Sequence, residues 1–112
     1  MQNENKEMKI KNLKENSEYI KKIKQLKNKF EGIKIIGIVG SFARGENFND
    51  IDLLYEVDKH FLNEVDPFYF FTYLTNIKEE LKRYLGVEVD LIDITTLNSI
   101  GKKYMLKDFI NV

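Results

Sequence analysis

The sequence predicts a small α/β (α+β) domain in which a mixed β-sheet is flanked by helices. Short runs of β-branched and apolar residues alternate with longer segments whose apolar residues recur every three or four positions. A chain of 112 residues has room for one domain. We therefore expect a flexible N-terminus at residues 1–9, where the sequence is polar and of low complexity, and a single domain at residues 10–112.

The first predicted elements are a helix and two strands. Apolar residues within Ile10–Phe30 fall along one stripe of an amphipathic helix, and Gly32 is its predicted terminator. The run Ile33–Val39 is mostly β-branched and too short for a packed helix, which predicts a buried strand. A second strand is predicted at Asp50–Val57, after a loop that contains glycine and asparagine.

The second half of the chain predicts a long helix, a third strand and short helical turns. Asp66 is a favourable N-cap and Pro67 is tolerated at the first helical position, so the helix begins there and continues to Gly86. Val87–Ile94 is the third predicted strand. One of the two threonines that follow is predicted to cap helical turns that run to the end of the chain.

Several aromatic residues lie near the start of the long predicted helix. Phe70 and Phe71 fit its core stripe. Tyr69 and Tyr73 share a different face, for which we prefer core or half-buried packing over an interface patch. His60 is assigned to a polar loop, without a role as a ligand.

Composition excludes several classes of protein. With no cysteine, the chain has no disulfide, thiol nucleophile or zinc–thiolate site. No stretch approaches the ~18 apolar residues of a membrane span, so we expect a cytoplasmic protein without a membrane segment or signal peptide.

Residues 1–32 hold nine lysines and five glutamates, whereas residues 33–112 hold nine basic and thirteen acidic residues. Because the N-terminal lysines alternate with glutamate and asparagine, a solvated helix face is favoured over a nucleic-acid-binding patch.

Three acidic residues on the predicted strands are candidates for chemistry. Asp50 and Asp52 are two residues apart on one strand, so their side chains point to the same face with Cα atoms ~6.6 Å apart. Asp90 joins them if the third strand lies beside the second. Three carboxylates suit Mg²⁺ or Mn²⁺, which prefer oxygen ligands. Taken singly, each is more commonly part of a solvated strand edge than of a site, and Asp93 illustrates this, because it needs only to cap the next helix.

A candidate phosphate site follows the first strand. Gly40 allows a phosphate to approach the backbone closely, and Ser41 can donate a hydrogen bond from its hydroxyl. Backbone N–H groups at the start of a short helical segment would add to such a site. Arg44 either stabilises charge on a bound phosphate or simply faces solvent, and a plain turn remains the alternative for the glycine and serine.

The order of these motifs resembles a known family. GSFARG at residues 40–45, NDIDL at 49–53 and VDL at 89–91 resemble the catalytic signature of the polymerase-β-type nucleotidyltransferases, and the short chain resembles their minimal nucleotidyltransferase (MNT) group. The resemblance extends from about Ile33 to Val112 and implies a polymerase-β-like nucleotidyltransferase core, with a C-terminal helix. The spacer from Gly45 to Asp50 is shorter than is usual in that family, and Asn49 stands where serine is most common.

The resemblance implies roles for these residues. Gly40 and Ser41 would hold the triphosphate of ATP, and Asp50, Asp52 and Asp90 would bind two Mg²⁺ ions. The implied reaction transfers AMP from ATP to a hydroxyl and releases pyrophosphate. Members of the MNT group commonly pair with a helical HEPN partner, and some are antitoxins of toxin–antitoxin systems that attach AMP to a tyrosine of a HEPN ribonuclease toxin.

Three functions therefore stay open. The first is an active antitoxin that modifies a HEPN-type partner. The second is a small-molecule (aminoglycoside-type) adenylyltransferase, which the lack of room for a substrate-binding domain disfavours. The third is a non-catalytic binding antitoxin. Direct binding to nucleic acid is the least favoured function, because no basic and aromatic groove is visible in the sequence.

Overall fold

The computed structural model describes residues 16–112, apart from the side chain of Tyr104. The predicted flexible N-terminus at residues 1–9 and the first part of the predicted N-terminal helix lie outside the described residues. Within the described part of the chain, no helix is long and apolar enough to cross a membrane.

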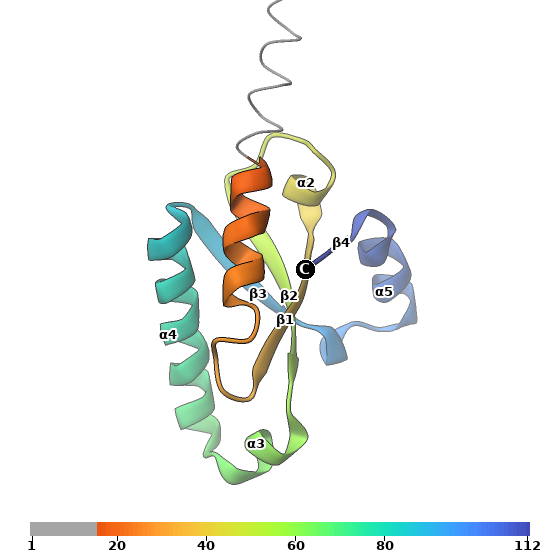
Figure 1. Ribbon diagram of the computed structural model, residues 1–112. Helices are drawn as coiled ribbons and strands as arrows, with labels where there is room; N and C mark the ends of the chain where they lie inside the picture. The colour runs from red at the N-terminus through yellow and green to blue at the C-terminus, as the bar shows by residue number, and fades with distance from the viewer. Residues whose placement is uncertain (1–15) are drawn as a thin grey trace, which may run out of the picture.

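A four-stranded mixed sheet forms the centre of the fold, with the strand order β3-β2-β1-β4 (Figure 1). β1 (Ile33–Val39) pairs antiparallel with β2 (Asp50–Val57), and β2 pairs parallel with β3 (Glu88–Asp93). The short β4 (Ile110–Asn111) pairs antiparallel with β1 on its other side. This sheet and its helices confirm the predicted fold class, and the third predicted strand does lie beside the second.

One face of the sheet carries the main core. The N-terminal helix (described over residues 16–26, orange in Figure 1) and α4 (Pro67–Leu85) both pack there. The buried core cluster comprises Ile23, Phe30, Ile33, Ile35, Ile38, Phe42, Ile51, Leu53, Tyr55, Ile77, Leu81, Leu85, Val89 and Val112. Shorter helical elements connect these parts: α2 (Gly40–Ala43), α3 (Lys59–Glu64), η1 (Ile94–Thr96), α5 (Ser99–Met105) and η2 (Leu106–Asp108).

The C-terminal segment packs on the sheet at a glycine of β1. Figure 1 shows α5 on the other side of β1 from α4. The ring of Phe109 occupies the space that a Cβ on Gly37 would need. Leu54 is fully buried although it alternates with the residues of the main core, so β2 is covered on both faces at that point.

The predicted boundaries of three elements agree with the structure. β1 and β2 begin and end at the predicted residues. α4 begins after Asp66, whose side chain accepts a hydrogen bond of 2.8 Å from the backbone N–H of Phe68. It ends at Gly86, which has the left-handed conformation of a helix C-cap with φ of 74°.

Two predictions in the first half of the chain were wrong. The N-terminal helix ends at residue 26, and Gly32, with φ of 75°, lies in the turn before β1 instead of capping the helix. Phe30 still reaches the core from that turn, which is why the apolar periodicity continued past the helix end. His60 lies on α3 and not in a loop, because the Asp58 side chain caps this short helix by accepting from the N–H of His60 at 2.8 Å.

The C-terminal region also differs from its prediction. Asn98, and neither Thr95 nor Thr96, caps α5 by accepting from the N–H of Gly101 at 2.7 Å. Asp93 caps η1, as predicted. The chain does not stay helical to its end, because the last residues form β4 and fill the free edge of β1.

The aromatic residues at the start of α4 are more exposed than predicted. Phe71 was assigned to the core stripe but is 71% exposed, whereas Phe70 does pack against the core. Tyr69 is also exposed, and its ring stacks on that of Tyr73 with centroids 6.1 Å apart. Tyr73 is partly buried and donates a hydrogen bond of 2.8 Å to the backbone oxygen of Glu31. The preferred half-buried packing therefore holds for Tyr73 but not for Tyr69.

Candidate active site

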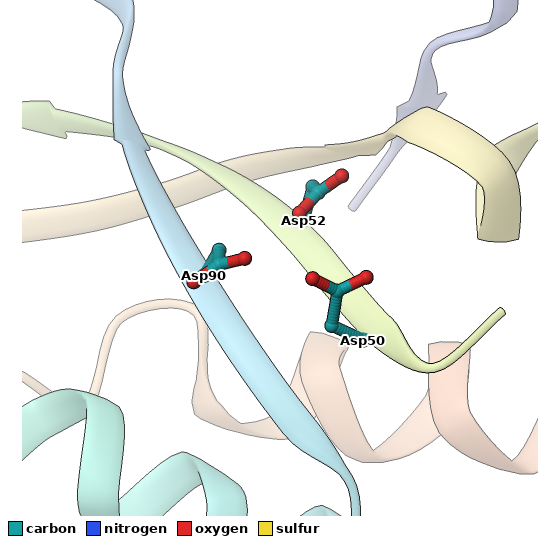
Figure 2. Close-up of side chains that lie close together, drawn as sticks. All are labelled: Asp50, Asp52 and Asp90. Atoms are coloured by element: carbon teal, nitrogen blue, oxygen red, sulfur yellow. The ribbon is translucent and has the colours of Figure 1, made fainter.

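Three carboxylates meet where β2 and β3 run side by side. Asp50 and Asp52 belong to β2, and Asp90 of β3 lies opposite Asp52 in the parallel register. One carboxylate oxygen from each residue lies within 4.8 Å of the other two. Figure 2 shows the three side chains converging from the two strands. The structure therefore brings together the three acidic residues that the sequence singled out.

The alternation of β2 and β3 explains why these side chains are accessible. Ile51 and Leu53 of β2 and Val89 of β3 are fully buried on the core face. The intervening aspartates must then point to the opposite face, where each is only partly buried. Because the strands are parallel neighbours, their acidic positions align at one place on that face.

The site has an excess of negative charge. The pKa of Asp50 is raised above its ordinary value, first by the adjacent Asp90 carboxylate, which favours a protonated partner, and then by partial burial and by the charge of Asp90. The pKa of Asp52 is also raised, first by burial and then by the charges of Asp50 and Asp90, while Arg44 lowers it. Like charges this close favour either a proton or a bound cation.

Gly40 is adjacent to the acidic cluster for a reason that the sequence did not reveal. It stands at the end of β1 and the start of α2, with φ of 83° in the left-handed region that favours glycine. A Cβ at this position would collide with the carboxylate of Asp52. Gly40 thus makes room for one of the three acidic side chains. Its role in holding a phosphate stays a prediction.

A pocket of about 260 Å³ opens beside Asp52. Gly40 and Arg44 line it from one side, and the C-terminal residues Met105, Lys107 and Asp108 contribute to its wall. Sequence reasoning missed these C-terminal residues, because they reach the pocket only through the folding of the C-terminal segment against β1. Larger hollows exist elsewhere, such as one of about 590 Å³ at the opposite end of β1, but none of the predicted site residues lines that one.

The two remaining phosphate-site candidates differ in their surroundings. Arg44 forms an exposed ion pair in which its Nε lies 3.0 Å from Oε1 of Glu46. Ser41 lies on α2 next to Gly40 and is partly buried, but it does not line the pocket. The structure therefore places Gly40 and Arg44 together with Asp52, and Ser41 at the edge of the group.

An aromatic cluster holds the loop between α2 and β2. The ring of Phe48 packs edge-to-face on Phe42 of α2, with centroids 4.9 Å apart, and on Tyr19 of the N-terminal helix, with centroids 5.8 Å apart. Such pairs are worth about 0.5–1.5 kcal/mol beyond the area that they bury. This packing anchors the short spacer that leads into Asp50.

Sequence reasoning also missed Lys78. Its Nζ lies 3.2 Å from Oδ1 of Asp90, so a basic side chain of α4 contacts the acidic cluster. Lys78 is one of several charged residues on α4, and no sequence pattern distinguishes it from the others. Its contact with Asp90 depends on how α4 packs beside β3.

Comparison with known proteins identifies the family. Residues 21–110, most of the chain, match the family described as polymerase beta nucleotidyltransferase. The chain belongs to this nucleotidyltransferase family. The match confirms the resemblance found in the signature motifs, and the protein is a nucleotidyltransferase enzyme.

Two archaeal proteins are similar to this nucleotidyltransferase over most of its length. A putative protein adenylyltransferase of Methanocaldococcus jannaschii is 36% identical over 101 residues, which cover 88% of this chain and 91% of that protein. The protein adenylyltransferase MntA of Thermococcus cleftensis is 34% identical over 89 residues, which cover 80% and 83% of the two chains. Both are consistent with the minimal nucleotidyltransferase group. No solved structure matches the chain at a comparable level of significance.

The acidic cluster fits the divalent metal that this family usually uses. Its three oxygen donors lie within 4.8 Å of one another, and they are partly exposed, so that waters and phosphate oxygens can complete the coordination. Carboxylate oxygens suit Mg²⁺ and Mn²⁺ and do not distinguish between them. The donor set therefore supports a divalent metal site without fixing the identity of the metal.

Proposed function

We propose that this nucleotidyltransferase is a Mg²⁺-dependent protein adenylyltransferase that transfers AMP from ATP to a tyrosine of a HEPN-type toxin. The observation that carries the proposal is the convergence of Asp50, Asp52 and Asp90 on one face of the sheet. Both relatives are named as protein adenylyltransferases, which supports AMP as the transferred group and a protein as the acceptor. The HEPN-type partner rests on the resemblance to the MNT group.

The chemistry is an in-line displacement at the α-phosphorus of ATP. A bond forms from the acceptor oxygen to this phosphorus, and the bond to the pyrophosphate oxygen breaks. Two Mg²⁺ ions bound by the three aspartates would stabilise the attacking and departing oxygens. We assign all three carboxylates as metal ligands, and we assign Asp90 a second role as the acceptor of the hydroxyl proton.

The phosphate side of the site is assigned to residues around α2. Arg44 lines the pocket next to Asp52, where its positive charge would stabilise the triphosphate. Ser41 would donate its hydroxyl to a phosphate oxygen, and Gly40 would allow the close approach of ATP. Lys107 lines the same pocket and adds a second positive charge there.

Transfer of radiolabelled AMP tests this function. We expect label to pass from ATP to a purified HEPN-type partner only when Mg²⁺ is present. Asp52→Asn and Asp90→Asn should each abolish labelling without unfolding the protein. The matched control is Glu56→Gln, because Glu56 is an exposed carboxylate of the same strand outside the cluster. It should label the partner at the wild-type rate.

The other open functions give different outcomes in the same experiment. Label that appears on an aminoglycoside, with no protein acceptor present, would replace the proposal with a small-molecule adenylyltransferase. A partner that is inhibited equally by wild-type protein and Asp52→Asn, without label, would indicate a non-catalytic binding antitoxin. Full labelling activity in either Asp→Asn variant would contradict the assignment of the site.

A further inference from the structure

Two ion pairs connect α4 to β3. Nζ of Lys82 lies 2.6 Å from Oε1 of Glu88, and Nζ of Lys78 lies 3.2 Å from Oδ1 of Asp90. The lysines are four residues apart on a helix and the acids two apart on a strand, distances of about 6 Å and 6.6 Å along the two elements. The spacings match, so one helix face presents two lysines to two successive acidic residues on the exposed face of β3.

The two pairs differ in what their acidic partners do. Asp90 belongs to the acidic cluster of the described residues, whereas Glu88 does not. Lys78 therefore contacts a carboxylate that the proposed function assigns to the metal. The lysine side chain is 43% exposed and carries its charge on a flexible stem, so it can move away from Asp90 into water.

A divalent cation and the Lys78 ammonium would compete for the Asp90 carboxylate. A divalent cation would be held by the Asp90 carboxylate, whose Oδ1 already lies 3.2 Å from Nζ of Lys78. Two positive charges that share one carboxylate repel one another. The divalent cation has the higher charge and would be held by all three carboxylates, so we expect it to displace the Lys78 ammonium from Asp90.

We propose that Lys78 is a positioning residue that neutralises Asp90 in the metal-free protein and is displaced when a divalent metal binds. This inference rests on the proposed metal site. Its consequence is that Lys78 weakens the binding of metal without nucleotide. An exposed ion pair is worth about 0.2–1 kcal/mol, so its loss corresponds to an effect of about 1.4- to fivefold on metal affinity.

Titration with Mn²⁺ in the absence of ATP measures this effect directly, with free Mn²⁺ followed by electron paramagnetic resonance. We expect Lys78→Met to bind Mn²⁺ about 1.4- to fivefold more tightly than the wild type. Lys78→Arg keeps a positive charge and should stay near the wild type. The control is Lys82→Met, which removes the neighbouring pair. Its partner Glu88 lies opposite Asp50 in the register but outside the cluster, so we expect a smaller change in affinity than for Lys78→Met.

A second measurement is thermal unfolding of the metal-free protein. Lys78→Met should lower the melting temperature, because it leaves three carboxylates without their lysine counter-charge, and saturating Mn²⁺ should remove most of the difference. Unchanged or weaker Mn²⁺ binding by Lys78→Met, or equal tightening in Lys82→Met, would overturn the role of Lys78. Equal Mn²⁺ binding by the wild type and Asp52→Asn would instead reject the metal site itself, and the inference with it.

Discussion

Replacing Gly40 with alanine should separate two reasons for a glycine at this position: its left-handed backbone conformation and the space that it leaves for the Asp52 carboxylate. The backbone at Gly40 has φ of 83°, and a Cβ there would overlap the Asp52 carboxylate. Gly45 has a similar φ of 73°, but a Cβ on it would meet no heavy atom of the described residues within 4 Å beyond its chain neighbours. Gly45→Ala is therefore a matched control that imposes the same backbone strain without touching the acidic cluster.

The expected sizes of the two effects follow from this geometry. A left-handed conformation costs an alanine about 1–2 kcal/mol, so both variants should lose roughly that much of their free energy of unfolding. Gly40→Ala must also push the Asp52 carboxylate away from Asp50 and Asp90. A ligand displaced by ~1 Å can cost on the order of a hundredfold in activity, and we expect at least a tenfold loss of Mn²⁺ affinity.

Urea denaturation, Mn²⁺ titration and AMP transfer together check this prediction. Both variants should show similar losses of stability, while only Gly40→Ala loses metal binding and transfer. If Gly40→Ala binds Mn²⁺ as tightly as Gly45→Ala does, the close approach of Gly40 to Asp52 does not control the site.

Two further predictions concern the acidic cluster and the C-terminal segment. Because burial and neighbouring carboxylates raise the folded-state pKa of Asp52 above 3.8, the contribution of Asp52 to the stability of the metal-free protein should be lost as pH rises from about 4 towards neutrality. Melting curves should therefore show Asp52→Asn to be more stable than the wild type at pH 7 without metal, with the difference vanishing near pH 4; a difference that grows on acidification would contradict this sign. Gly37→Ala should cost about 1–3 kcal/mol in urea denaturation, because its Cβ would overlap the ring of Phe109. The same substitution in a Phe109→Ala background should be nearly neutral, and an equal cost in both backgrounds would exclude the contact with Phe109 as its cause.

Local sequence signals predicted the strands and the long helix well. β1 and β2 were found because their apolar runs are bounded by glycine and polar residues, and α4 because Asp66 and Gly86 mark its two ends. The acidic positions were found because strand alternation fixes which side chains share a face. These features depend on neighbours in the chain, so they can be read without a tertiary structure.

The predictions that were wrong, or that the sequence did not make, share a different cause. Phe30 continues the helical apolar pattern, but it reaches the core from a turn, and periodicity cannot distinguish the two. Phe71 fits a helical core stripe but is exposed, whereas its neighbour Phe70 packs against the core. The C-terminal strand β4 consists of two residues, too few for any pattern, and forms because β1 has a free edge. In each case the partner surface, and not the local sequence, sets the outcome.

The sequence was sufficient to predict the fold class, the family signature and the candidate aspartates, because these follow from short-range periodicity and motif order. Only the folded chain decided that β3 lies beside β2 and brings Asp90 to the other two. Three contacts of the site came only from the folded chain: Gly40 against Asp52, Lys78 against Asp90, and the C-terminal residues that line the pocket. Each joins residues at least twelve positions apart in the chain, so each depends on how helices and strands pack. Contacts between residues this far apart depend on the shape and burial of whole helices and strands, and a local sequence pattern does not contain that information.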